Sequence, residues 1–97
     1  MDEADVKVRA KSHGDAVVAG DMRTAGGDLL PEAVAQAPEV MSGMPKPVRS
    51  AEIVEVRNED DAVYTVCAYR GDNEELKVQS RWIERDGTPK IADLQVV

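Results

Sequence analysis

His13 is the side chain in this sequence best suited to move a proton. It recurs with Val6, Ala10 and Val17 at spacings of three and four residues, which places it on the apolar stripe of an expected helix over residues 3–20. An imidazole there would face the core and could act as a general base near neutral pH. The alternative is a core histidine that hydrogen-bonds a carbonyl or a carboxylate, and the sequence leaves both open.

Asp93 is the second candidate for chemistry, because it lies in an apolar segment between Ile91 and Leu94. If the carboxylate points inward, burial would disfavour its charged form, and a pairing with His13 would make a catalytic dyad. If it points outward, it is a solvated carboxylate or the partner of an arginine on the neighbouring strand. The choice depends on strand register, which the sequence does not fix.

Three aromatic side chains and two arginines complete the candidates. Tyr64, Tyr69 and Trp82 are the only large rings, since the chain has no Phe. They could line a pocket or a dimer interface, with a tyrosine donating to a developing oxyanion in an enzyme, or they could simply pack the core. Arg81 and Arg70 could bind an anionic ligand, although pairing across the sheet with a glutamate is the commoner arrangement.

Other chemistries lack their residues. A single His and a single cysteine, Cys67, leave no zinc ligand set and no internal disulfide, and Cys67 sits in an apolar run typical of a buried thiol. The Gly26-Gly27 pair follows no strand and lacks the third glycine of a dinucleotide-binding loop. Inhibition of the cystatin type would need a Gln-x-Val-x-Gly hairpin, which is missing. We therefore expect no cofactor and no metal.

The chain divides into a helical part, residues 1–45, and a sheet part, residues 46–97. After the first helix, Pro31 suits the first position of a second helix, with Asp28 or a neighbour as its cap, and Pro38 should kink or divide that helix. From residue 48 the apolar period changes from 3.6 to 2, which predicts strands. The expected strands cover residues 48–57, 62–70, 75–85 and the segment after the Asp86-Gly87 turn.

The strand at residues 62–70 is apolar on both faces, with Cys67 and Tyr69 on one and Val66 and Ala68 on the other. A strand of this kind is covered on both sides. The helices can cover only one face, so we expect a second protomer on the other. The sequence thus predicts a homodimer built on a single domain, residues 1–97.

Nineteen acidic against twelve basic residues give a formal charge of −7, with no basic cluster. Binding to nucleic acid or to an anionic membrane surface is therefore not expected. The first residues contain no apolar segment of a secretory signal, and no stretch reaches membrane-spanning length. We expect a cytoplasmic location.

The order of elements and two short motifs resemble the NTF2-like (SnoaL-like) superfamily of cystatin-like α+β folds. The first helix carries a histidine and ends in Ala19-Gly20-Asp21, and the segments Val78–Gly87 and Lys90–Leu94 look like the family's closing hairpin. The chain is too short for the additional strand and helix usual in the family, and Pro89 stands where many members have an aromatic. We therefore expect a shortened member with a shallow cone rather than a deep pocket.

The resemblance implies helices packed on a curved four-stranded antiparallel meander, often dimeric through the outer sheet face. Its members include isomerases, dehydratases, ligand-binding domains and scaffolds, so the fold does not decide the function. The leading hypothesis is a non-enzymatic module that dimerises and binds a small apolar ligand or a protein partner, with Tyr64, Tyr69, Trp82 and Arg81 at the ligand site or interface. The alternative is a small isomerase or dehydratase that uses His13 and Asp93.

Overall fold

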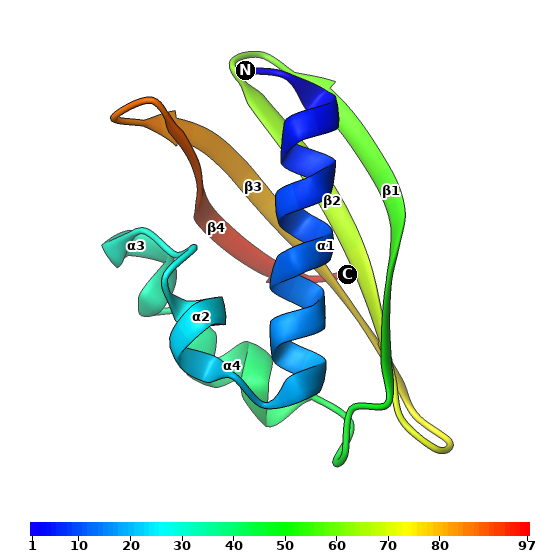
Figure 1. Ribbon diagram of the computed structural model, residues 1–97. Coiled ribbons are helices and arrows are strands. Elements are labelled where there is room, and N and C mark those ends of the chain that lie inside the picture. Colours follow the sequence, from blue (N-terminus) through cyan, green and yellow to red (C-terminus); the bar gives the residue numbers. More distant parts are fainter.

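The computed structural model describes residues 1–97 and has the predicted α+β architecture (Figure 1). A long helix and three short ones precede four strands that form one antiparallel sheet in the order β1-β2-β3-β4. No helix combines the length and the apolar character needed to cross a membrane. The elements are α1 (Glu3–Ala19), α2 (Met22–Gly26), α3 (Pro31–Val34), α4 (Ala37–Ser42), β1 (Ser50–Glu59), β2 (Ala62–Arg70), β3 (Glu75–Arg85) and β4 (Thr88–Val96).

Helix α1 has well-defined ends and packs closely on the sheet. The Asp2 side chain accepts a hydrogen bond from the Ala4 amide, and Gly20 ends the helix with a positive φ of 75°, a conformation that glycine adopts without strain. Gly14 faces β1, and a Cβ built on it would lie 3.1 Å from the Cβ of Ala51. The glycine therefore lets the helix and the strand approach each other more closely than a larger residue would.

The segment after α1 folds into short helices because prolines and glycines interrupt it. Pro31 begins α3 as expected, but the residue before it, Leu30, takes the cap position and no side chain caps the helix. A neighbour of Asp28 thus takes the cap position, but the capping hydrogen bond that an Asp28 side chain would accept is absent. Pro38 lies in the first turn of α4, so the predicted helix is divided into α3 and α4.

The expected strands agree closely with the observed ones. Residues 62–70 and 75–85 form β2 and β3, whereas β1 begins two residues later than expected and continues to Glu59. Asp86 and Gly87 both have positive φ at the predicted final turn, as does Asp60 at the first turn.

The outer face of the sheet is covered by the chain's own polar side chains. Val66 and Ala68 are only 6% and 0% exposed without any second protomer. In the sheet register, Ala68 lies between Glu52 and Lys77 on the neighbouring strands. The long stems of such residues cover apolar surface while their charged ends stay in water.

Two arginines tie this outer face together. Arg70 donates hydrogen bonds to Glu52 on β1 and to Glu75 on β3. Arg57 lies over the ring of Tyr64, with its guanidinium carbon 4.7 Å from the ring centre. The requirement for cover, on which the predicted homodimer depended, is thus met within one chain.

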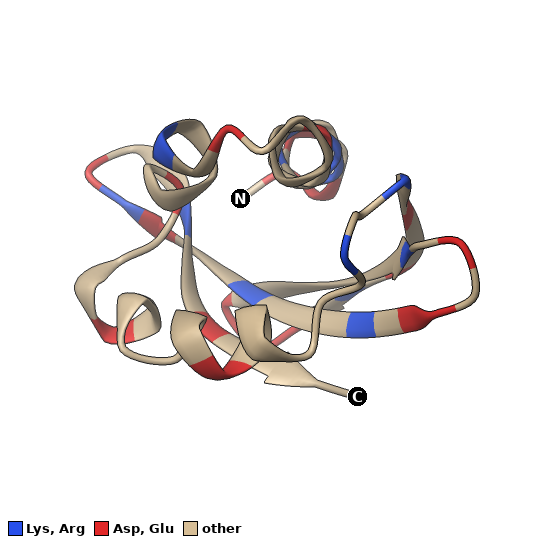
Figure 2. Cartoon of the chain, turned by 90° about the horizontal axis from the view of Figure 1, so that it is seen from below, with Lys and Arg blue, Asp and Glu red and all other residues tan.

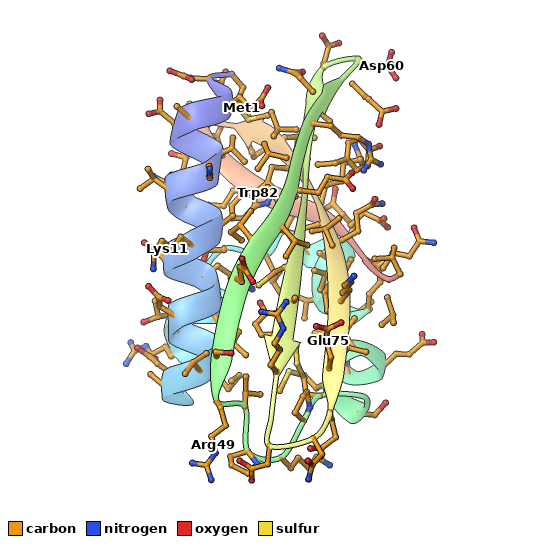
Figure 3. The ribbon with its side chains drawn as sticks, turned by 90° about the vertical axis from the view of Figure 1, so that its right-hand side faces the viewer. Met1, Lys11, Arg49, Asp60, Glu75 and Trp82 are labelled. Atoms are coloured by element: carbon orange, nitrogen blue, oxygen red, sulfur yellow. The ribbon has the colours of Figure 1, made fainter.

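The inner face of the sheet carries α1 over β1 and β2, while the short helices lie at the β4 side (Figure 1). Trp82 lies between α1 and the strands, and Lys11 projects from the opposite side of the helix (Figure 3). The indole is 1% exposed and donates a hydrogen bond from Nε1 to Oγ1 of Thr65 at 3.0 Å. Acidic and basic residues are distributed around the molecule without a single-sign face (Figure 2).

Candidate functional site

A cavity of about 410 Å³ lies between the short helices, the C-terminal half of α1 and the inner face of the sheet. Twelve of its sixteen lining residues are hydrophobic. Its volume falls near the lower end of the roughly 300–1,000 Å³ typical of small-molecule sites.

The cavity exists because the segment that roofs it is made of short elements and small side chains. Helices α2, α3 and α4 contain only five, four and six residues. Ala25, Gly26 and Ala37 stand on the cavity wall where longer side chains would fill the space. Met22, Val34 and Met41 also line the cavity, and they are 43%, 52% and 38% exposed. Together they give the cavity an apolar, partly solvent-exposed border.

The polar part of the wall is centred on His13. Its Nδ1 lies 3.0 Å from Oδ2 of Asp28, and the two side chains are only 13% and 18% exposed. The imidazole also stands edge-on to the Trp82 indole, with ring centres 6.4 Å apart. The histidine is therefore held on one side by a carboxylate and on another by an aromatic ring.

Asp28 is fixed in place by backbone pairing with β4. Its carbonyl accepts a hydrogen bond from the Ile91 amide at 2.8 Å, and the Leu30 amide donates to the Ile91 carbonyl at 2.8 Å. This two-bond clamp joins the segment before α3 to the edge of the sheet, where Leu29 and Ile91 form a parallel bridge. The clamp brings Asp28 within hydrogen-bonding distance of a helix fifteen residues earlier in the chain.

Two side chains of the cavity wall carry a polar atom that has no hydrogen-bond partner within the protein. Nε2 of His13 and Oγ of Ser80 have no hydrogen-bond partner within the protein. In contrast, every side-chain nitrogen or oxygen that is fully buried does have a partner. Both atoms must therefore be accessible, although Ser80 as a whole is buried. His13, Ser80 and Tyr69 all line the cavity, so it presents three side chains that can form hydrogen bonds in otherwise apolar surroundings.

The structure does not bring Asp93 to His13. Leu94 lines the cavity opposite Ser80, and its neighbour Asp93 lies opposite Arg81 in the register of β3 and β4. Because alternate residues of a strand face opposite sides, Asp93 points away from the cavity. Its Oδ1 accepts a hydrogen bond from Nε2 of Gln36 at 2.7 Å, and the same glutamine accepts one from the Leu94 amide. Asp93 thus fastens the short helices to the sheet edge.

The aromatic candidates separate by face. Tyr69 lines the cavity, and Trp82 is buried beside it in contact with His13. Tyr64 lies on the outer face beneath Arg57, opposite Arg81, and neither Tyr64 nor Arg81 borders the cavity. Burial raises the pKa of the Tyr69 hydroxyl far above its ordinary value, so this group stays neutral.

Asp28 is a site residue that the sequence indicated only as a possible helix cap. Its Gly-Gly-Asp context before a proline is typical of a loop or a cap, and the fifteen-residue separation from His13 carries no periodic signal. No group of three or more His, Cys, Asp and Glu side chains is arranged to hold a metal ion. Comparisons of the chain with protein families, with curated proteins and with solved structures find no match.

Proposed function

We propose that this protein is a non-enzymatic binding module that takes a small, largely apolar molecule into the cavity beside His13. The observation that carries the proposal is a cavity of about 410 Å³ with twelve hydrophobic residues among the sixteen that line it. At the roughly 30 Å³ that one water occupies in the liquid, it accommodates about fourteen non-hydrogen atoms. That size suits a single small molecule rather than a helix or strand of a partner protein.

The side chains at the border of the cavity favour the same interpretation. Met22, Met41 and Met44 line it, and the flexible thioether chain of methionine adapts to ligands of different outline. The exposed apolar border would become buried around a bound molecule, which removes apolar surface from water and contributes to affinity.

An NTF2-like relationship and a cytoplasmic location remain part of the proposal. The relationship is supported by the order of elements, with a histidine-bearing first helix on an antiparallel meander. Dimerisation stays a prediction as well, although its original reason is weaker. Because Val66 and Ala68 are covered within one chain, a dimer through the outer face would have to form through polar contacts.

Native mass spectrometry of protein purified gently from its own cells tests ligand and subunit number together. We expect a retained mass of roughly 200 Da per chain, from about fourteen light atoms. The Ser80→Leu variant should lose this mass, because the new side chain projects from a rigid strand into the cavity. Gln79→Leu is the matched control, since Gln79 lies on the same strand with its side chain toward the outer face.

Loss of the retained mass in both variants would point to general disruption rather than to the cavity. Absence of any retained mass in the unmodified protein, together with no stabilisation by apolar molecules of this size, would contradict the proposal. Retention of a protein instead would favour the partner-binding form of the hypothesis.

Proton transfer is the second candidate function, and the pairing of His13 with Asp28 is what favours it. In an isomerase or dehydratase of this kind, His13 would be the base, Asp28 would take the orienting role first given to Asp93, and Tyr69 would be the hydroxyl donor. An enzyme would convert the retained molecule, and His13→Gln would stop conversion while leaving binding largely intact. A module of the first kind would release the molecule unchanged.

A further inference from the structure

We infer that the molecule bound in the cavity carries a hydroxyl group that donates a hydrogen bond to Nε2 of His13. This inference rests on the proposed binding function and goes beyond it, because it names the chemical group that the site recognises. It follows from which of the two imidazole nitrogens carries the proton when the Asp28 carboxylate faces the ring.

The starting observation is the position of Asp28. Its carboxylate lies 3.0 Å from Nδ1 of His13. Its carbonyl accepts a hydrogen bond from the Ile91 amide at 2.8 Å, and the nearby Leu30 amide donates to the Ile91 carbonyl at 2.8 Å. The two side chains come from separate elements, and both are largely buried. The pairing is therefore a fixed property of the fold rather than a contact between mobile surface groups.

An ionised carboxylate only accepts hydrogen bonds, so the atom that faces it must donate. In a neutral imidazole one nitrogen carries the proton and the other carries a lone pair. Asp28 therefore places the proton of neutral His13 on Nδ1, in the way that carboxylates fix the tautomer of metal-binding histidines. Nε2, the nitrogen without a partner, is left as an acceptor.

A ligand atom opposite this nitrogen must be a donor. A hydroxyl meets the requirement, whereas a ketone oxygen would face Nε2 with a lone pair against a lone pair. Ser80 does not discriminate between them, because a serine hydroxyl both donates and accepts. His13 and Ser80 are, with Tyr69, the only side chains of the wall that can form hydrogen bonds, so selectivity for the hydroxyl falls to His13.

The test compares 2-decanol, 2-decanone and n-undecane, which have the same number of non-hydrogen atoms and fit the volume of the cavity. Affinities are measured by titration calorimetry at about pH 8.5, on the alkaline side of the range in which imidazoles titrate. We expect 2-decanol to bind about tenfold more tightly than 2-decanone, because an unmet hydrogen bond at a desolvated acceptor reduces binding by about this factor. Both molecules can pair with Ser80, so the ratio of their affinities reports on His13, and undecane measures the apolar contribution alone.

Asp28 acts here as a positioning residue, and Asp28→Asn tests that role. The amide can donate to Nδ1, which lets the ring proton move to Nε2 and allows a ketone to be bound. The preference for the alcohol should then fall to within about twofold, while the affinity for undecane should not change. A purely structural role for Asp28 would instead lower all three affinities together.

His13→Gln provides a second variant, because its amide both donates and accepts and should also abolish the preference. Equal binding of alcohol and ketone by the unmodified protein would overturn the inference while leaving the proposed function in place. Tighter binding of the ketone would overturn it too, as would a full tenfold preference retained in both variants. Failure of all three molecules to bind would contradict the proposed function itself.

Discussion

The inner face of the sheet has two ends that are packed differently. At the closed end a cluster of six residues is 0–4% exposed and surrounds Trp82. At the open end a cluster of eight residues is 3–8% exposed and borders the cavity. The closed end consists of Val6, Ala10, Ala33, Val63, Trp82 and Ile91, and the open end of Ala16, Val17, Ala25, Val40, Met44, Cys67, Tyr69 and Val78.

The difference shows how a chain of this length divides its interior between stability and a site. The closed end uses its one indole, fixed by the hydrogen bond to Thr65, to fill the space between α1 and the sheet. The open end has no side chain of that size under α2 and α4, and small residues stand on its wall. His13 stands between the two ends, in contact with Trp82 and also lining the cavity.

The largest effect is expected from truncating the closed end. Trp82→Ala removes the indole from surroundings where it is 1% exposed and leaves Thr65 without its partner. Such truncations cost about 3–5 kcal/mol of unfolding free energy, which is a large part of the total unfolding free energy of a small domain. Met44→Ala at the open end should cost about 2 kcal/mol or less, because the methionine already borders a cavity. Urea denaturation measures both.

An equal loss in the two variants would mean that the two ends are packed alike. Trp82→Phe serves as the control, because it keeps most of the apolar volume while it removes the hydrogen bond to Thr65. Its loss should lie near about 1–3 kcal/mol, the cost of an unpaired buried polar group together with some lost contact.

The elements of the sheet could be predicted because each depends on nearby residues. The alternation in residues 75–85 and the Asp86-Gly87 turn specify β3 and the start of β4 within one hairpin. Pro38 divided the second helix as expected, since a proline acts on its own turn. The helix over residues 3–20 was confirmed to within one residue.

The site could not be predicted in the same way because it depends on contacts between distant segments. Asp28 reaches His13 only because its loop pairs with Ile91, more than sixty residues later in the chain. The face of Asp93 depends on a register shift between Arg81 and Trp82, which no local pattern announces. Strand β2 is apolar on both faces, and this correctly predicted that both faces are covered. The groups that cover the outer face come from the same chain.

Within the open end, two glycines compare the interface of α1 with β1 and the roof of the cavity at the level of single methyl groups. Gly14→Ala would bring a Cβ to 3.1 Å from the Ala51 Cβ and 3.5 Å from Sγ of Cys67, so the helix would have to move away from β1. We expect a net loss of about 1 kcal/mol, because the strain outweighs the gain in helix propensity of about 1 kcal/mol. Gly26→Ala, beside the cavity, meets nothing within 4 Å and should gain up to about 1 kcal/mol.

Thermal denaturation of the two alanine variants, read against the unmodified protein, measures this difference. Opposite signs would show that the interface of α1 with β1 is tight while the roof of the cavity is not. A gain in both variants would indicate that α1 can shift without cost and that its interface with β1 is no tighter than the roof of the cavity.

The smallest effect on stability at neutral pH is expected from two ionisable side chains of the open-end cluster, Cys67 and Tyr69. This effect is also the most specific to the open end. Burial is the main cause that raises the pKa of both the Cys67 thiol and the Tyr69 hydroxyl. When a folded-state pKa is raised, the unfolded chain loses its proton first, so stability is complete below the unfolded pKa and decreases as pH rises above it. The decrease should begin near about pH 8.5 for the thiol and about pH 10 for the hydroxyl.

Tyr69→Phe should therefore flatten the decrease of the unfolding free energy above about pH 10. Cys67→Ala should flatten the part of this decrease that begins at about pH 8.5. For either variant we expect little change in the unfolding free energy between about pH 6 and 8. Unfolding free energies measured by urea titration at several pH values test this. Tyr64→Phe is the matched control, because it removes the same hydroxyl from the outer face instead of the open end. The same flattening in the Tyr64 variant would indicate that alkaline unfolding begins at the outer face, where Arg57 and Arg70 pair with glutamates, and not at the open end.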